Sequence, residues 1–147
     1  MVSPVTAFPN GLSSYGVPLI GSGPILTTGK VYFVSSTHVN ASDDNVGTDP
    51  GSPLKTISKA IGKTKANNGD FILVAQKHVE TVTAAAGLNF NVAGITIIGL
   101  GSGENRPVVN LTTDVLATVQ VASADVKLVN ILFKAGIDAL AILLDVN

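Results

Sequence analysis

The sequence predicts an all-β fold, built as a parallel β-solenoid that follows one helix and an N-terminal arm. From residue 70 onward the chain consists of short β-rich runs, with no second long helical pattern among them. Two of these runs, VAGITIIGL and SADVKLVNI, echo each other, and Ile95 and Val126 are 31 positions apart (126 − 95). That interval fits one coil of a β-solenoid.

The alternative β architectures are sandwiches and meanders, whose hairpins favour two-residue Asn-Gly or Asp-Gly turns between strands. The Asn-Gly pairs of this chain lie elsewhere, because Asn10-Gly11 falls within the arm and Asn68-Gly69 follows the helical pattern. A parallel solenoid fits better, since its inward positions stack from coil to coil while its loops vary in length.

Residues 1–29 form a segment without a charged residue, in which prolines and glycines alternate and exclude a helix. The segment is too apolar for a solvated linker. It is either an irregular stretch packed on its own domain or an extended arm that docks on another subunit, and we favour the arm. The expected particle- or subunit-binding residues are Phe8, Leu12, Tyr15, Val17, Leu19 and Ile20.

Residues 30–147 form the second expected unit, the solenoid domain. Lys30 opens the β-rich run KVYFVSS, and a loop rich in Asn, Asp, Gly, Ser and Pro follows it. Ser52 fits a helix N-cap and Pro53 the first helical position, so a helix is predicted over about residues 53–67. Its apolar stripe consists of Leu54, Ile57, Ala60 and Ile61.

The remaining strands are expected in eight short runs. They are FILVA, VETVT, NFNV, GITIIG, PVVNLT, ATVQVA, DVKLVNILF and LAILLDV. Four asparagines in these runs, Asn89, Asn91, Asn110 and Asn130, indicate stacked amide hydrogen bonding inside the solenoid.

A glycine-rich loop follows the strand that ends near Gly99, which is how a dinucleotide-binding turn begins. The spacing, however, is G-x-G-x-G rather than G-x-G-x-x-G. In addition, Pro107 and β-branched residues occupy the positions where the required helix would start. We therefore predict a sharp turn between two strands rather than a nucleotide site.

The composition narrows the range of partners. The chain has 147 residues, enough for one domain with a proper core, and its net charge is −1. Neither nucleic acid nor an anionic membrane is therefore an expected partner. The absence of cysteine excludes disulfides, thiol catalysis and thiolate metal sites. No secretory signal pattern and no run of about 20 apolar residues occurs, so we expect no classical export and no membrane span.

The surface is expected to be covered by partners or sister subunits. Only 13% of the residues are charged, against roughly a quarter in an average soluble domain. The mean hydropathy is +0.44. A monomer with so few charged side chains would expose much apolar surface, which is typical of an interaction face.

Residues 31–61 carry four motifs in a particular order: Tyr32-Phe33-Val34-Ser35, Asp44-Asn45-x-Gly47-Thr48, Pro53-Leu54-Lys55-Thr56-Ile57 and Ala60-Ile61. This order resembles the opening of right-handed parallel β-helix proteins of the pectate-lyase-like type, although Val39-Asn40-Ala41-Ser42 replaces their usual Asn-Gly. The resemblance implies a right-handed parallel β-helix. It also implies that the helix is an N-terminal cap, which shields the first coil and its open edge.

Residues 69–111, which begin GDFILVAQKHVETV, resemble a group of tailed-bacteriophage virion proteins that read G-D-x-I-x-V-A-P-G-H-x-E-T-I. The openings of those proteins also resemble FPNGLSSYGVPLIGSG in the arm. Gln76-Lys77 replaces their Pro-Gly before His78, so a different turn is expected there. The last residues form an apparent strand without a cap, so either more chain follows or a partner covers that end.

The candidate catalytic and metal-binding residues are few. His78 beside Glu80 is either a base with its orienting carboxylate or, as we favour, a histidine at a turn that hydrogen-bonds to backbone. The oxygens of Asp43, Asp44, Asn45 and Asp49 suffice for Ca²⁺, but the full calcium loop is missing, so a solvated Asx-rich turn is preferred. The paired carboxylates that polysaccharide cleavage requires are not evident.

The phage resemblance implies a non-enzymatic virion structural protein on the outer surface of the particle, a capsid decoration or head-fibre protein. Its expected partners are capsid or other virion proteins, and we expect a homotrimer without cofactor or metal. The alternative is a tailspike or tail-fibre component that binds or cleaves host polysaccharide. For that alternative the test residues are Glu104 and Arg106, the sole arginine.

Overall fold

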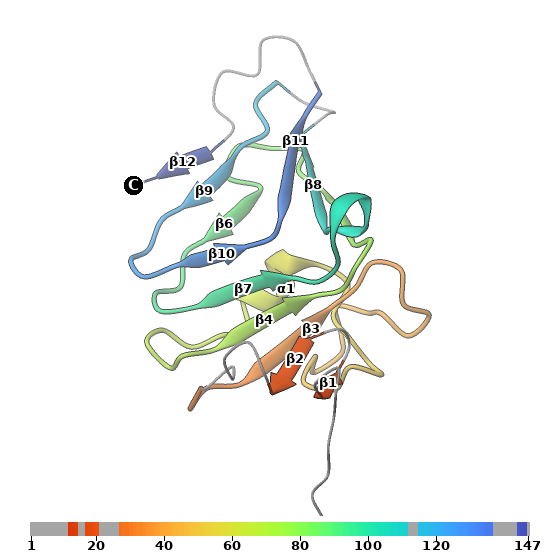
Figure 1. Ribbon diagram of the computed structural model, residues 1–147. Coiled ribbons are helices and arrows are strands. Elements are labelled where there is room, and N and C mark those ends of the chain that lie inside the picture. The colour runs from red at the N-terminus through yellow and green to blue at the C-terminus, as the bar shows by residue number, and fades with distance from the viewer. Residues whose placement is uncertain (1–11, 15–16, 21–26, 112–114, 137–143, 147) are drawn as a thin grey trace, which may run out of the picture.

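The computed structural model describes residues 12–14, 17–20, 27–111, 115–136 and 144–146. Within this part of the chain the fold is mainly β, as predicted, and most of its strands lie in parallel sheets (Figure 1). No helix of the described residues is long and apolar enough to cross a membrane.

Three parallel sheets form the body of the molecule. Sheet 1 contains β3 (Val31–Val34), β4 (Phe71–Val74), β7 (Thr96–Gly99) and β10 (Lys127–Val129). Sheet 2 contains β5 (Val79–Thr81), β8 (Val108–Leu111) and β11 (Leu132–Ala135). Sheet 3 contains β6 (Leu88–Phe90), β9 (Val119–Val121) and β12 (Leu144–Val146).

From β4 to β12 the chain passes through sheets 1, 2 and 3 in the same order three times (Figure 1). Thr96 of β7 pairs with Lys127 of β10, which confirms the 31-residue interval (127 − 96) between the two echoing runs. The run DVKLVNILF was predicted as a single strand, but the structure divides it into two. Asn130 has a φ of 58°, a left-handed conformation that asparagine tolerates, and it divides the run between sheets 1 and 2.

The core lies between the three sheets, where alternate residues of each strand point inward. Ile72, Ile97 and Val109 are fully buried there, and Phe90 of β6 is the largest side chain with no exposed surface. The apolar side chains are less buried toward the end of the described chain. The partly buried ones there are Val126, Leu128, Ile131 and Phe133. The apolar alternation therefore accounts for the core of the earlier strands.

The helix is shorter than the sequence predicts, since α1 spans only Ile57–Ile61. Its N-cap is Thr56, whose hydroxyl accepts a hydrogen bond from the Lys59 N–H at 3.2 Å, and not Ser52. Leu54 is drawn into a parallel bridge with Val34 of β3. The backbone hydrogen bonds of that bridge hold Leu54 in an extended conformation, so the predicted first helical turn does not form.

The glycine-rich loop lies between β7 and β8, so the predicted turn between two strands is confirmed. It contains a short 3-10 helix, η1 (Gly103–Asn105), and no α-helix follows. Gly101 has a φ of 94°, a conformation that a side chain would strain. The Gln76-Lys77 turn likewise contains a left-handed residue, because Lys77 has a φ of 59°.

Part of the arm forms a hairpin, whereas an extended chain was expected. β1 (Leu12–Ser14) pairs antiparallel with β2 (Val17–Ile20), and only two residues separate these strands, which favours a hairpin. Phe8 and Tyr15 lie outside the described residues. For Leu12, Val17, Leu19 and Ile20 the structure describes the backbone strands. The two strands form a sheet of their own, separate from sheets 1 to 3.

Candidate binding surface

The outer face of sheet 1 carries an apolar row that crosses all four strands. Phe33 pairs with Leu73, Leu73 pairs with Ile98, and Ile98 pairs with Val129 in a continuous parallel register. The neighbours of these residues along the strands, such as Ile72 and Ile97, point into the core. The row therefore faces away from the core.

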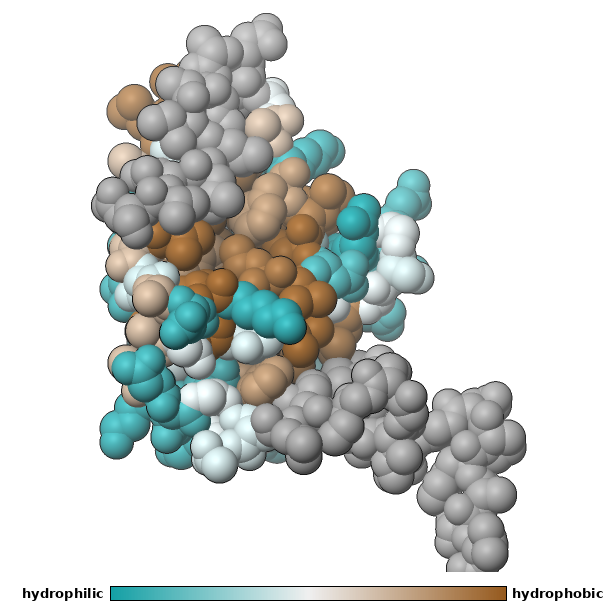
Figure 2. Space-filling model, turned by 60° about the vertical axis from the view of Figure 1, so that its left-hand side comes forward, coloured by the Kyte–Doolittle hydropathy of each residue, from teal (hydrophilic) through white to brown (hydrophobic). Residues whose placement is uncertain are grey.

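Five residues form a second hydrophobic cluster outside the main core: Leu73, Leu100, Val31, Phe33 and Ile98. Leu73 and Leu100 are only 6% and 9% exposed, because their neighbours in this cluster cover them. Val31, Phe33 and Ile98 keep more of their surface accessible. Hydrophobic side chains also gather in the middle of the face that Figure 2 presents, with hydrophilic side chains around them.

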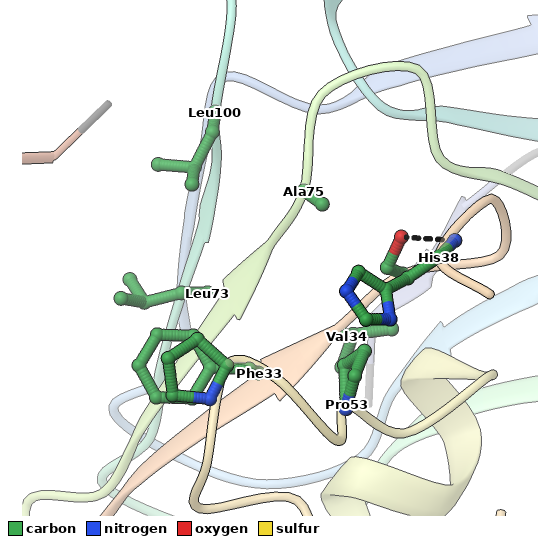
Figure 3. A pocket seen from close by; sticks show the side chains of 9 residues that line it. Phe33, Val34, His38, Pro53, Leu73, Ala75 and Leu100 are labelled. Carbon is green, nitrogen blue, oxygen red and sulfur yellow. Dashed lines mark hydrogen bonds between the residues drawn. The ribbon is translucent and has the colours of Figure 1, made fainter. Parts of the chain in front are cut away.

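A pocket lies at the end of this row where β3 and β4 lead into their loops (Figure 3). Phe33, Leu73 and Leu100 lie on one side of it, and His38 and Pro53 lie on the other (Figure 3). The remaining lining residues are Val34, Ser35, Pro50 and Ala75. The cavity volume of the pocket is about 60 Å³, and its lining suits a small apolar side chain.

Two polar side chains at the pocket have their positions set by the loop after β3. The Ser35 hydroxyl oxygen accepts hydrogen bonds from the backbone N–H of His38 at 3.1 Å and of Thr37 at 3.3 Å. The Nδ1 atom of His38 accepts from the Asn40 N–H at 3.2 Å. The neutral ring therefore carries its proton on Nε2, which supplies a hydrogen-bond donor beside an apolar pocket.

The side chain of His78 was expected to hydrogen-bond to backbone. It contacts a carboxylate instead. Its Nε2 lies 3.3 Å from Oε2 of Glu80, and the imidazole is fully buried. The Glu80 carboxylate accepts hydrogen bonds from the backbone N–H of Ile57 at 2.6 Å and of Ser58 at 3.3 Å. The pair thus supports the N-terminus of α1, and burial keeps the ring from acting on a substrate.

The acidic loop is an Asx-rich turn, as preferred from the sequence. Asp43 accepts hydrogen bonds from the backbone N–H of Lys55 at 3.0 Å and of Thr56 at 2.9 Å. The Asp49 carboxylate accepts from the Gly51 N–H at 3.0 Å, two residues along the chain. Asn45 donates to the carbonyls of Asn40 and Pro53. Within the described chain no group of three acidic, histidine or cysteine residues has the arrangement of a metal site.

The other predicted polar positions have separate roles. The Asn130 amide donates to the carbonyls of Gly99 and Gly101 at 2.8 Å each, so it bonds to backbone rather than to a stacked amide. Glu104 is exposed in η1, and Arg106 bonds the Gly103 carbonyl through Nε. These two residues belong to the loop between β7 and β8.

Sequence reasoning missed the outer row of sheet 1. The stretch FILV of β4 is apolar at every position, and TIIGL after Ile95 is nearly so, although a strand with one buried face alternates. This excess of apolar residues indicates a second covered face. The row does not depend on the arm residues that were predicted to bind, which lie in β1, β2 or outside the described chain.

Comparisons of the chain with protein-family models, with curated proteins and with solved structures found no match. Its function is therefore inferred from its own residues and their geometry. The apolar row with its pocket is a partly accessible feature of the described surface. An apolar surface of this kind is suited to being covered by apolar side chains.

Proposed function

We propose that this chain is a non-enzymatic structural protein of a tailed-bacteriophage virion. It serves as a capsid decoration or head-fibre protein, and the N-terminal arm anchors it to the outer surface of the particle. The observation that carries this proposal is the contrast between the two parts of the chain. The arm has no charged side chain. In the domain, by contrast, carboxylate side chains accept hydrogen bonds from backbone N–H groups of the domain itself.

In this proposal the three sheets are the faces of a right-handed parallel β-helix, and α1 is its N-terminal cap. The repeated passage through sheets 1, 2 and 3 supports the coil arrangement. Parallel β-crossovers are right-handed in about 98% of cases, which supports the handedness. The contacts of α1 with β3, β4 and β6 support its place as a cap over the first strands.

The hydrogen bonds of three carboxylates, of which Asp70 is buried, support a structural rather than an enzymatic role. Asp70 accepts hydrogen bonds from the backbone N–H of Lys30 and Lys65, each at 2.7 Å, and from the Asn68 amide. Glu80 and Asp43 support the start of α1 in the same manner. Glycosidases instead require two carboxyl groups free to face the same sugar. These three acids are already engaged with the backbone.

Removal of the arm tests the proposal. Because Gly29 and Lys30 are bonded to Thr27 and Asp70, the deletion should end at residue 26 and leave these contacts in place. We expect the truncated protein to keep its circular dichroism spectrum but to lose its cosedimentation with particles that lack this protein. A full-length variant with Leu19→Asp and Ile20→Asp should behave in the same way. Particles that retain the truncated protein at full occupancy would contradict the proposal.

The polysaccharide alternative makes a different prediction. Purified protein would then release oligosaccharides from host surface glycans, and Glu104→Gln or Arg106→Gln would abolish the release. We expect no release from the unmodified protein. The same incubation with boiled protein provides the background, and release above it that either substitution removes would refute the non-enzymatic assignment.

A further inference from the structure

We propose that the outer face of sheet 1 is the receptor for the N-terminal arm of a second copy of this chain. An apolar side chain of that arm occupies the pocket between Phe33, Pro53 and Leu100. The inference rests on the proposed role of the arm as the binding element. It adds the surface that the arm binds and the identity of the partner.

The chemistry of the face matches that of the arm. Residues 1–29 contain no charged side chain, so the arm has no group that must remain in water. The row from Phe33 to Val129 is also uncharged, and the pocket at its end is lined mainly by apolar groups. Burying the row against the arm removes apolar surface from water on both sides, while the exposed Lys127, on the same face two positions before Val129, can remain in water.

The exit point of the arm lies next to this face. The Lys30 N–H is bonded to Asp70, and the next residue, Val31, belongs to the outer hydrophobic cluster. Twenty-six residues precede Thr27, and residues 12–20 fold back in the hairpin, so the other seventeen (26 − 9) span at most roughly 55 Å at about 3.3 Å per residue. A domain of this size has a radius of gyration of about 13 Å. The arm can therefore reach the equivalent face of a neighbouring copy.

The hairpin within the arm is a suitable partner for the apolar row of another copy. β1 and β2 pair with each other and with no strand of sheets 1 to 3 (Figure 1). A lone hairpin of strands three and four residues long is marginally stable in water at best. It requires a surface to pack against, and the apolar row of another copy supplies one.

Photo-crosslinking in the full chain tests this assignment. The sequence has no cysteine, so Ile98→Cys provides one unique position on the row for a benzophenone maleimide label. The labelled chain is produced with ¹⁵N, dissolved in urea with a tenfold excess of ¹⁴N unmodified chain, and dialysed before illumination. Val79→Cys is the matched control, because Val79 is 48% exposed but belongs to β5 of sheet 2.

Mass spectrometry of the adducts gives the result. We expect the label at position 98 to attach mainly to ¹⁴N peptides from residues 1–26, which identifies the arm of another copy. The label at position 79 should give no arm adduct above background. Attachment mainly to ¹⁵N arm peptides would show that the arm folds back on its own chain. That result, or the absence of arm adducts at position 98, would overturn the inference.

Assembly in solution provides a second measurement that does not depend on labelling. We expect Ile98→Asp to raise the dissociation constant of the assembly at least about tenfold, because a charge would be buried under the arm. Val79→Asp, which adds the same charge outside the row, should change it less than about twofold. Equal effects of the two substitutions in sedimentation velocity would contradict the assigned surface.

The two proposals fail in different experiments. If arm adducts are absent while arm deletion still removes the protein from particles, the receptor face is wrong and the anchoring role stands. If the adducts form as expected but truncated protein stays on particles, the anchoring role is wrong and the contact between copies stands.

Discussion

Asp70 joins the start of β3 to the end of the helical region. Its side chain is 1% exposed and accepts three hydrogen bonds, from Lys30, Lys65 and Asn68. Burial tends to raise the pKa of this carboxyl group. The two backbone N–H donors, the Asn68 amide and the charge of Lys30 lower it more, so the pKa lies below its ordinary 3.8.

Asp70→Asn should reduce the free energy of unfolding at pH 7 by about 1–3 kcal/mol, because an amide nitrogen would face a backbone donor. The stabilisation from the charged carboxylate is fully present above pH 3.8 and is lost as the pH falls through the lower pKa of the folded protein. Urea unfolding at several pH values measures both effects. The variant should lack this acid-dependent loss, whereas Asp44→Asn, at an exposed position, should keep the stability and pH profile of the unmodified protein.

Glu80 and His78 stabilise the start of α1 from a different strand. Glu80→Ala should lower the free energy of unfolding by about 1–3 kcal/mol, since the Ile57 and Ser58 N–H groups and the buried imidazole would lose their acceptor. Glu104→Ala removes a carboxylate of the same type from an exposed position and should change stability by less than about 0.5 kcal/mol. Similar unfolding midpoints for the two variants would contradict the role of Glu80.

At the scale of the elements, the end of β7 packs tightly against the turn between β10 and β11. A Cβ on Gly99 would lie 2.3 Å from the carbonyl oxygen of Asn130 and 2.9 Å from the Pro107 ring. Gly99→Ala should therefore lower the free energy of unfolding by about 1–3 kcal/mol, because the corner between β10 and β11 would have to move. Gly51→Ala is the control, since its Cβ would meet only the Asp49 side chain at 3.4 Å or more. Thermal unfolding compares the two.

Strand positions could be predicted from the sequence because the alternation of buried and accessible residues is local. The FILVA and GITIIG runs became β4 and β7 for this reason. The helix boundaries depended on distant partners. Leu54 bonds the backbone of β3, and Glu80, 23 positions after Ile57, caps the helix, so no local pattern could place its start.

The candidate surface was harder to predict than the strands. Phe33, Leu73 and Ile98 are 25 to 65 positions apart in the sequence (98 − 73 and 98 − 33), and only the parallel register brings them into one row. Their apolar character was visible in the sequence, but the register that aligns them was not. The pocket further depends on the loop that places His38 and Pro53 beside that row.

At the scale of the whole molecule, we expect a homotrimer. Only 13% of residues are charged, the apolar row of sheet 1 is partly accessible, and β10, β11 and β12 are edge strands of the described sheets. Closed three-fold symmetry lets each arm cover its neighbour without open-ended polymerisation. Light scattering should give three times the chain mass of 14.9 kDa. A stable monomer at micromolar concentration would refute intrinsic trimerisation.

The spacing of paired strands also determines when each contact can form during synthesis. Val31 pairs with Phe71, 40 positions later (71 − 31), and Val108 pairs with Leu132, 24 positions later (132 − 108). At roughly 5–20 residues per second, a ribosome releases each partner strand one to several seconds after the first. Because the strands of each parallel sheet pair in chain order, the nascent chain can add them in that order, starting beside α1. A chain diluted from denaturant has no such order, and its distant pairings should make its folding slow.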